Sequence, residues 1–569
     1  MRSYEPNPHY SPVGGEVSIG WPAALQHDVF PHSASGVVLA IDGPMCLDWT
    51  MVVQEIAMAI PPNCTVSFLD MREAALPWSV VQHLTETPEL ADDPDFAMLP
   101  RITLAEIFGE LPIVTADPGH VSVVFGPGAS LVSHNVLWYA DLPKRYAEAH
   151  VVGGGGRNLG QRAVDGPSTT KYLFYVDWPL LDQHRDSIAP SIDRFLDTQD
   201  SRTPKSLPGS TLRATLEKLV GQPFRTRPTF NTTSWGGNWA QQQLGMNPDA
   251  RNTALGYELI APESGVLIGD SPDAVVEVPF QLLVALHPAE VLGPDVQATF
   301  GTSFPIRFDY LDTVNGGNLS VHCHPQLEYM RDVFGWPYTQ HETYYMMVGA
   351  PDNKVFLGIR DSADVDEFHR AAHDAHHAGV EFDIERYVQT FPATPHQLFV
   401  IPAGTPHGSG EGNVVLEVSA TPYLYSLRFF DWLRRDSDGT QRPVHVERAF
   451  ANLNTNRSGD AVKADLVQNP RDIRSGPHWR EELLGALPEM FFEVRRIVID
   501  SNETVTDNTA ARFHVLNVVE GEGVEIETTD GLRQTFAYAE TIIVPASVGS
   551  YKMTCVGQVQ VRLVKALVP

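Results

Sequence analysis

Short apolar runs alternate with amphipathic stretches along the first 200 residues of the chain. Apolar runs occupy residues 36–41, Thr65–Leu69, Val121–Phe125 and Leu137–Tyr139, and a stretch with helical spacing extends from about Trp49 to Ile60. Strands that alternate with helices in this order indicate a parallel α/β layer. We therefore expect the N-terminal part of the chain to fold as an α/β domain.

From about Phe224 onward the pattern changes to short β-type runs separated by Gly, Pro and Asn, which predicts antiparallel sandwiches or barrels. The polar stretch Asp197 to Pro208 has the composition of a linker. Two inserts look helical, Asp364 to Gly379 and roughly Arg448 to Leu487. The expected organisation is an α/β domain at 1–205, a β domain with a helical insert at 206–430, a helical segment at 431–488 and a C-terminal β domain at 489–569.

Charge and composition narrow the classes of function. The chain has 569 residues with 70 acidic against 40 basic side chains, a formal net charge of −30. Nucleic acids and anionic membranes require a basic surface, so neither is an expected partner. The four cysteines are too scattered for a disulfide framework, and no run of 18 apolar residues or apolar leader is present. These features predict a cytoplasmic protein.

The turn after the first apolar run, Ile41-Asp-Gly-Pro44, stands where a phosphate-binding loop stands in a nucleoside kinase, and this segment resembles that fold. The Gly-Lys-Ser/Thr that should follow is absent, and Met45-Cys-Leu-Asp-Trp49 stands in its place. Without the lysine and the hydroxyl, the phosphates and magnesium of ATP lack their partners. We expect a degenerate, P-loop-kinase-like α/β domain that has lost catalysis; an intact enzyme of unfamiliar type is the alternative.

The strongest chemical signal is a set of histidines in the central part of the chain. His322 and His324 alternate with Cys323, so on a strand both imidazoles point to the same face. About eighty residues later, Pro402-Ala-Gly-Thr-Pro-His407 delivers a third histidine. This His-x-His followed by Pro-x-Gly-x-x-His is the two-part signature of the cupin barrel. A fourth ligand could come from Glu328, by the cupin spacing, or from Glu342.

Residues 304–448 resemble type I phosphomannose (mannose-6-phosphate) isomerase, a zinc enzyme of the cupin superfamily. The resemblance rests on four matches in order along the chain, and residues 513–523 resemble the second cupin of that family. It implies a bicupin fold behind the kinase-like domain. The matching segments are Leu319-Ser-Val-His322-Cys-His324-Pro325, Gln340-His341-Glu342, Pro402 to His407, and Asp431-Trp-Leu-Arg434.

The resemblance also implies roles for particular residues. His322, His324, Glu342 and His407 would bind Zn²⁺, with iron or manganese as alternatives. Glu417 and Arg434 would act in catalysis, while Ser320 and Arg435 would bind substrate. The competing interpretations are a structural histidine pair, an outward-facing Glu417 and a Ser320 that caps a turn. On the enzymatic interpretation, the protein isomerises mannose 6-phosphate to fructose 6-phosphate through an enediolate, and its partner is a sugar or sugar phosphate.

Three departures from the family bear on the substrate. A glutamine ligand of the family is His322 here, and two lysines of the family are Gln340 and Asp309. Losing two cations weakens the expected grip on phosphate, which needs charge partners; Arg307, Arg360, Arg428 or Arg435 could replace them. The alternatives are a cupin metalloenzyme of other chemistry, such as an iron oxygenase, and a non-catalytic carbohydrate-binding or regulatory protein. The helical histidines 369, 373 and 376 are expected to form a solvated polar face.

Overall fold

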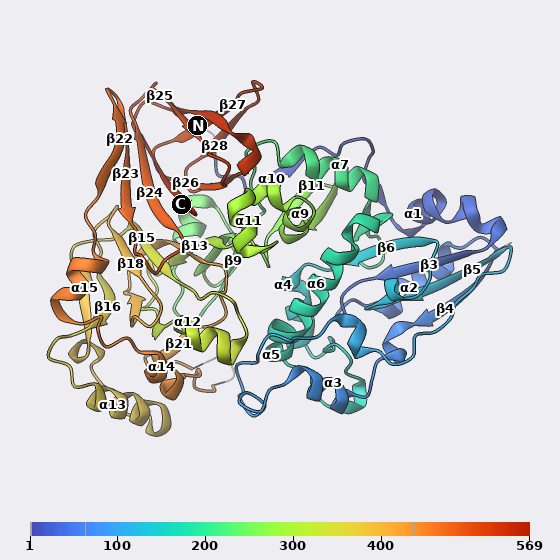
Figure 1. Cartoon of the computed structure of the whole chain (residues 1–569), viewed down its shortest axis with the longest axis horizontal. Helices are drawn as coiled ribbons and strands as arrows, with labels where there is room; N and C mark the ends of the chain where they lie inside the picture. Colours follow the sequence, from blue (N-terminus) through green and yellow to red (C-terminus); the bar gives the residue numbers. More distant parts are fainter. Residues whose placement is uncertain (1–2, 63, 436–438) are drawn as a thin grey trace.

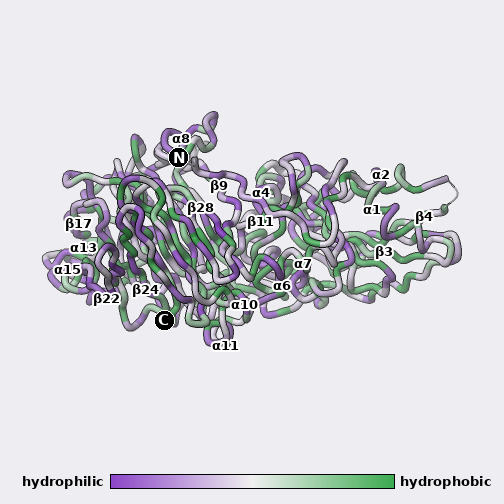
Figure 2. The backbone as a smooth tube through the Cα atoms, turned by 90° about the horizontal axis from the view of Figure 1, so that it is seen from above, coloured by the Kyte–Doolittle hydropathy of each residue, from purple (hydrophilic) through white to green (hydrophobic). Residues whose placement is uncertain are grey.

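The structure is a computed structural model that describes residues 3–62, 64–435 and 439–569. Residues 1–2, 63 and 436–438, which fall within the predicted 1–205 and 431–488 regions, lie outside the described residues. The molecule is elongated, with a parallel sheet at one end and antiparallel sheets at the other (Figures 1 and 2). No helix among the described residues is long and apolar enough to cross a membrane.

The N-terminal end is an α/β body, built on a seven-stranded sheet in the order β2-β8-β7-β6-β3-β5-β4. Five neighbouring strands of this sheet are parallel, and the predicted α/β layer is confirmed. Strands β3 (Val37–Asp42) and β6 (Val136–Asp141) are buried at every position, because helices cover both faces of the sheet. The other strands are β2 (Ser18–Ile19), β4 (Thr65–Asp70), β5 (His120–Phe125), β7 (Arg194–Asp197) and β8 (Lys205–Pro208), and the longer helices are α1 (Trp21–Asp28), α2 (Trp49–Ala59), α3 (Trp78–Thr85), α4 (Lys144–Val152), α6 (Trp178–Ile188) and α7 (Gly209–Leu219).

The expected linker at Asp197 to Pro208 is wrong. Strand β8 pairs antiparallel with β7, so this segment is a hairpin of the sheet, and the α/β body continues through α7. The polar composition has a local cause. Asp197 and Asp200 accept hydrogen bonds from the backbone N–H groups of Gln199 and Arg202, at 3.1 and 3.0 Å, which closes the turn.

The rest of the chain forms two antiparallel β bodies, as the pattern of short strands predicted. In the first β body, sheet β18-β15-β20-β13-β10-β9 packs against sheet β17-β16-β19-β14-β21. In the second β body, sheet β22-β23-β24-β31-β26-β29 packs against β25-β30-β27-β28. The strands of the first body are β9 (Thr229–Asn231), β10 (Leu255–Leu259), β13 (Ile306–Asp312), β14 (Val321–Cys323), β15 (Glu342–Val348), β16 (Lys354–Ile359), β17 (Val388–Pro392), β18 (Leu398–Ile401), β19 (His407–Ser409), β20 (Val414–Ala420) and β21 (Leu427–Phe430).

The second β body begins earlier than expected, inside the segment predicted to be helical at 431–488. Helices α14 (Val446–Asn452) and α15 (Gly459–Leu466) confirm the first half of that prediction. The second half is wrong, because 471–476 and 479–485 are strands β22 and β23. Strand β22 is an edge strand with mostly exposed polar residues, so it carries no alternating apolar pattern. The remaining strands are β24 (Glu493–Ile499), β25 (Thr504–Asn508), β26 (His514–Glu520), β27 (Gly523–Thr528), β28 (Arg533–Ala537), β29 (Thr541–Val544), β30 (Ser550–Val556) and β31 (Val561–Leu567).

The helical insert predicted at Asp364 to Gly379 is confirmed as α13 (Val365–Ala378). The carboxylate of Asp364 caps the first turn by accepting a hydrogen bond from the Glu367 N–H at 2.9 Å. The helix ends at Gly379, whose φ of 65° is left-handed and favours glycine. Its histidines do not join the buried histidine cluster described below, in line with a solvated polar face.

The N-terminal segment belongs to the β end of the molecule, although it precedes the α/β body in sequence. Strand β1 (His9–Tyr10) pairs in parallel with β11 (Gly265–Ser271), which forms a hairpin with β12 (Ala274–Pro279). Both chain ends therefore lie beside the β bodies (Figure 1). The Val13 N–H donates to Thr215 Oγ1 of α7 at 2.9 Å, so the chain enters and leaves the α/β body at neighbouring points. The α/β body is thus an insertion near the start of the β part.

Candidate metal centre

Three histidines meet inside the first β body. His322 lies on β14, His324 directly follows that strand, and His407 is the first residue of β19. The two strands pair with His322 opposite His407, and the side chains of all three histidines offer ring nitrogens within 4.8 Å of one another. All three are buried. Strand alternation and sheet pairing therefore bring together the histidines that the motif singled out.

Backbone carbonyls orient these imidazoles. The Nδ1 atoms of His322, His324 and His407 lie 3.0, 3.2 and 2.9 Å from the carbonyl oxygens of residues 320, 425 and 405. An Nδ1–H that donates to a carbonyl leaves the Nε2 lone pair free for the opposite side of the ring. The three rings are thus held in the tautomer that suits metal ligation through Nε2.

Glu342 completes the cluster from the start of β15. Its Oε2 lies 2.5 Å from His324 Nε2 and 3.5 Å from His407 Nε2. Its other oxygen, Oε1, and His407 Nε2 are buried and have no hydrogen-bond partner among the described residues. Buried polar atoms without partners are rare, and a cation between them would satisfy both. Three imidazoles and one carboxylate fit a divalent metal such as zinc.

The protonation states of the cluster also suit a metal. Burial lowers the pKa of His322 well below its ordinary value, and the neighbouring histidines lower it further. Burial alone would raise the pKa of Glu342, but His407 and His324 hold that pKa well below its usual range. The neutral form of His322 and the ionised form of Glu342 are the forms of these side chains that bind metals. Glu328, the competing candidate, lies exposed on the short helix α12 (Leu327–Tyr329), outside the cluster.

A second set of charged side chains lines the same cavity from strands β13 and β20. Arg307 pairs with Glu417 across these strands and lies 3.1 Å from Asp309, measured from Nη1 to Oδ2. Ser419 Oγ donates to Glu417 at 2.8 Å. Burial raises the pKa of Glu417 well above its ordinary value, although Arg307 opposes this. Glu417 is therefore inward-facing, not an outward strand residue, and its proton is held tightly.

The remaining predicted site residues divide between the cavity and its surroundings. Ser320 lines the cavity with the histidines, and its Oγ lies 3.4 Å from His322 Nδ1. Arg434 is not among the lining residues; it bonds to Asp431 at 2.8 Å and to the Asn318 carbonyl. Arg435 is exposed and donates to the Gly439 carbonyl at 2.7 Å.

Arg442 is a cavity-lining cation that the sequence did not reveal. It lines the cavity together with Arg307 and Arg428, and its Nη1 lies 2.9 Å from Asp431 Oδ2. The motif pointed to the Asp431 segment, but Asp431 binds two arginines, and only the fold distinguishes which of them faces the cavity. Arg360 donates to the Glu385 carbonyl and does not line this cavity.

In the α/β body, a carboxylate occupies the turn where a phosphate loop was considered. Asp42 accepts hydrogen bonds from the backbone N–H groups of Gly43, Gly128 and Ser130 at 2.8, 3.1 and 2.9 Å. Burial would raise its pKa, but His184 and Ser130 hold the pKa below its usual value. An ionised Asp42 already takes the Gly43 N–H of that turn, and it repels a second anion.

Comparisons with known proteins match the α/β body to a family model and part of the chain to isomerases. A family model described as "Domain of unknown function (DUF8485)" matches residues 20–221. The mannose-6-phosphate isomerase of Streptococcus mutans is 24% identical over 249 residues, which cover 43% of this chain and 72% of that protein. The mannose-6-phosphate isomerase ManA of Bacillus subtilis is 21% identical over 345 residues, covering 59% of this chain and 96% of that protein.

Among solved structures, the mannose 6-phosphate isomerase from Bacillus subtilis has a TM-score of 0.48 at 18% identity, covering 60% of this chain and 99% of that chain. A zinc-bound mannose 6-phosphate isomerase has a TM-score of 0.46 at 15% identity, covering 61% and 99%. Over part of its length, then, the chain is homologous at low identity to sugar-phosphate isomerases. The relatives are mannose-6-phosphate isomerases. These matches give no support to the predicted kinase-like character of the N-terminal domain.

Proposed function

We propose that the protein is a metal-dependent aldose–ketose isomerase that interconverts mannose 6-phosphate and fructose 6-phosphate. The observation that carries the proposal is the buried triad of His322, His324 and His407, whose ring nitrogens lie within 4.8 Å of one another. The Glu342 carboxylate lies beside this triad, 2.5 Å from His324 Nε2 and 3.5 Å from His407 Nε2. The homology to mannose-6-phosphate isomerases supports the same reaction class. We propose these four residues as the ligands of a zinc ion.

The reaction moves a proton between two neighbouring carbons and develops negative charge on a substrate oxygen. A bound zinc ion supplies Lewis-acid stabilisation of that charge and orients the sugar. Glu417 is the proposed proton carrier, because it faces the same cavity and its raised pKa suits a group that both accepts and returns a proton. Arg307 stabilises the ionised form of Glu417 through their ion pair.

Arginines of the cavity are the proposed partners of the substrate phosphate. The chain as a whole is strongly acidic, yet Arg307, Arg428 and Arg442 all line the metal cavity. A phosphate dianion needs such charge-assisted hydrogen bonds. Arg428 and Arg442 therefore take the substrate-binding role in place of the exposed Arg435, and Ser320 keeps the role proposed for it. Arg434 holds the Asp431 segment against Asn318.

A turnover assay tests the proposal. The purified protein loaded with Zn²⁺ should convert mannose 6-phosphate into fructose 6-phosphate, measured by coupled detection of the product, and should act more slowly on free mannose. His407→Ala should abolish both zinc retention and turnover, while His373→Ala on the exposed side of α13 should change neither. Oxygen consumption by an iron-loaded protein without isomerisation would instead favour a cupin oxygenase. Zinc binding without turnover would favour a carbohydrate-binding protein.

A further inference from the structure

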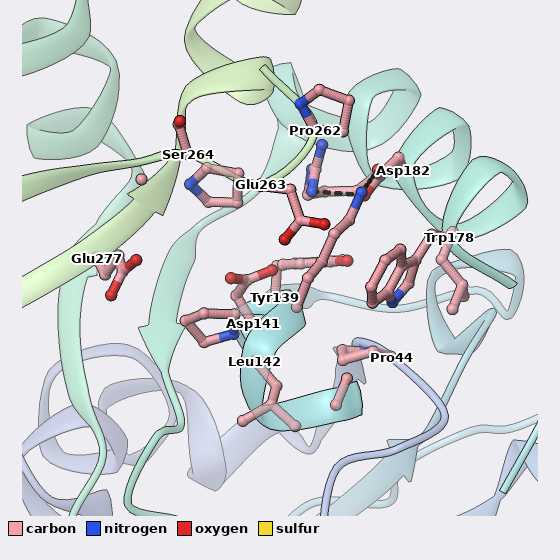
Figure 3. Close-up of a pocket in the computed structure, with 17 residues that line it drawn as sticks. Pro44, Tyr139, Asp141, Leu142, Trp178, Asp182, Pro262, Glu263, Ser264 and Glu277 are labelled. Carbon is pink, nitrogen blue, oxygen red and sulfur yellow. Dashed lines mark hydrogen bonds and ion pairs between the residues drawn. The ribbon is translucent and has the colours of Figure 1, made fainter. Parts of the chain in front are cut away.

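A second cavity lies between the α/β body and the β11–β12 hairpin, outside the carboxyl ends of β3 and β6 (Figure 3). In the strand order, β4 lies toward one edge of the sheet from β3, and β7 lies toward the opposite edge from β6. The direction of the chain crossovers therefore reverses between β3 and β6. Open α/β sheets bind ligands at such a reversal of strand order. Pro44 after β3 and Tyr139 and Asp141 on β6 line the cavity, and residues 262–265 of the β part close it. Its volume is about 40 Å³, which suits a group of a few heavy atoms, and it opens to solvent at its mouth.

The cavity is acidic. Its lining carries four carboxylates, Asp141, Asp182, Glu263 and Glu277, against the two cations Lys144 and Arg185. Several of these charges are already paired. Lys144 Nζ lies 2.6 Å from Asp182 Oδ2, and Arg185 Nη1 lies 2.9 Å from Asp182 Oδ1. Arg145, which approaches from α4, binds both oxygens of Glu277 at 2.7 and 2.6 Å.

Asp141 is the exception. It is 6% exposed, and the described residues give its carboxylate no hydrogen bond and no salt bridge. The attraction of Arg185 offsets its burial only in part. In Figure 3 its carboxyl group points into the cavity toward that of Glu263. By contrast, Asp42, the last residue of the neighbouring strand β3, accepts several hydrogen bonds. An aspartate at the end of a strand in this sheet can therefore find partners within the protein. A buried carboxylate without a partner is expensive, which points to a partner that comes from outside the chain.

The facing carboxylate of Glu263 is only partly satisfied. Its Oε1 accepts a hydrogen bond from the Tyr423 hydroxyl at 2.5 Å, and the residue is half-buried. Burial raises the pKa of Glu263 and raises that of Asp141 to about 7. A positive group placed between the two carboxylates would favour their ionised forms and lower both pKa values.

We propose that this cavity binds a small organic molecule that carries a primary ammonium group, with Asp141 and Glu263 as its acceptors. An ammonium offers three donors and a positive charge, which suit two facing carboxylates. The wall already holds one such group, since Lys144 Nζ sits against Asp182 and 4.9 Å from the centre of the Trp178 ring. A phosphate would be repelled by the four carboxylates that line the cavity. Among the described residues only the histidines 322, 324 and 407 meet the geometry of a metal-ion cluster, so a metal is not the expected occupant.

Ethanolamine and ethylene glycol are matched probes, because they differ only in an ammonium in place of a hydroxyl. We expect ethanolamine to raise the Tm of the full-length protein saturably, at millimolar concentrations that suit so small a ligand, and ethylene glycol at the same concentration to have no such effect. Sodium phosphate should not raise Tm through this cavity. Sodium chloride controls the ionic strength in every sample.

Asp141→Asn should weaken the ethanolamine response at least tenfold, while Asp270→Asn, at an exposed position, should leave it unchanged. Glu263→Gln gives a second, independent loss if Asp141→Asn folds poorly. An unchanged response in both cavity variants would overturn the proposal. So would an equal response to ethylene glycol, a phosphate response that Asp141→Asn removes, or no saturable response to ethanolamine in the parent protein. The metal-site variants above do not enter this test, so the two proposals fail separately.

Discussion

His322 and His407 lie directly opposite each other in the register of β14 and β19. This pairing places two metal-ligand candidates on one face of one sheet, with His324 and Glu342 closing the group. The isomerase family that the chain resembles has a glutamine ligand at the position of His322. We therefore expect His322→Gln to retain zinc and to keep isomerase activity within about tenfold, whereas His322→Ala loses both. Metal content by mass spectrometry and turnover with mannose 6-phosphate measure this. Equal losses in the two variants would contradict the assigned role.

Glu417→Gln should separate catalysis from metal binding. The amide keeps the shape of the side chain and can still accept hydrogen bonds from Arg307 and Ser419, but it cannot carry a proton. We expect kcat to fall by about 10²–10⁴-fold while zinc content stays the same. Steady-state kinetics and metal analysis of the same preparation check this. A variant that keeps its kcat would show that Glu417 only supports Arg307.

Arg442 and Arg434 offer a matched pair for the phosphate contact. Both bind Asp431, at 2.9 and 2.8 Å, but only Arg442 lines the metal cavity. Arg442→Gln should raise KM for mannose 6-phosphate at least tenfold, since one charge-assisted contact to phosphate is lost. Arg434→Gln loses the same kind of ion pair and should change KM far less. Similar KM values for the two variants would place the phosphate elsewhere.

The pH dependence of stability should reveal Asp141. Burial raises its pKa to about 7 against the influence of Arg185, while Asp197, Asp182 and Glu277 add to the rise. The folded protein therefore binds a proton more tightly than the unfolded chain, so this group favours folding below about pH 4 and loses that contribution as pH rises to about 7. In the ligand-free protein, Asp141→Asn should be more stable than the parent at pH 8, by up to about 4 kcal/mol. Urea denaturation at pH 5 and pH 8 measures the difference.

Removing the α/β body tests whether the β part folds without the inserted domain. A variant that joins residue 13 to residue 222 through a short Gly/Ser linker keeps β1, Tyr4 and Glu5. In this variant Glu5 N–H can still donate to Glu540, as it does at 2.8 Å. It should unfold cooperatively and bind zinc. A chain that starts at residue 222 lacks those contacts and should unfold at a lower urea concentration. Equal midpoints would show that the N-terminal segment adds no stability to the β part.

Much of the site could be predicted because its signals are local. The alternation of His322 and His324 fixed their common face, and the turn before His407 marked the start of a strand. The choice of Glu342 over Glu328 depended on family resemblance, and the structure shows why local spacing misleads: Glu328 lies on a helical turn that points to solvent. Arg442 was missed because the motif contains only Arg434, whereas Arg442 lies further along the same loop and reaches Asp431 only in the fold.

The fold was predictable where the burial of an element leaves an apolar pattern in the sequence. Strands β3 and β6 are buried on both faces and read as apolar runs. Strand β22 was predicted as helix because its edge position leaves its polar side chains exposed. Asp141 illustrates a different limit. A lone aspartate at the end of an apolar run is ordinary in sequence, and its lack of a partner becomes visible only when every neighbouring element is placed.

The contact between Val13 and Thr215 bears on how the α/β body can move and on how it could be gained or lost in evolution. An appended domain hangs on one covalent connection and can swing freely. An inserted domain is connected by two adjacent chain segments, which restrict its rotation about either segment alone. The same adjacency means that one insertion or deletion at these two points could add or remove the whole α/β body without interrupting the sheets of the two β bodies. The cavity at its edge would then be gained or lost together with the module that carries Asp141.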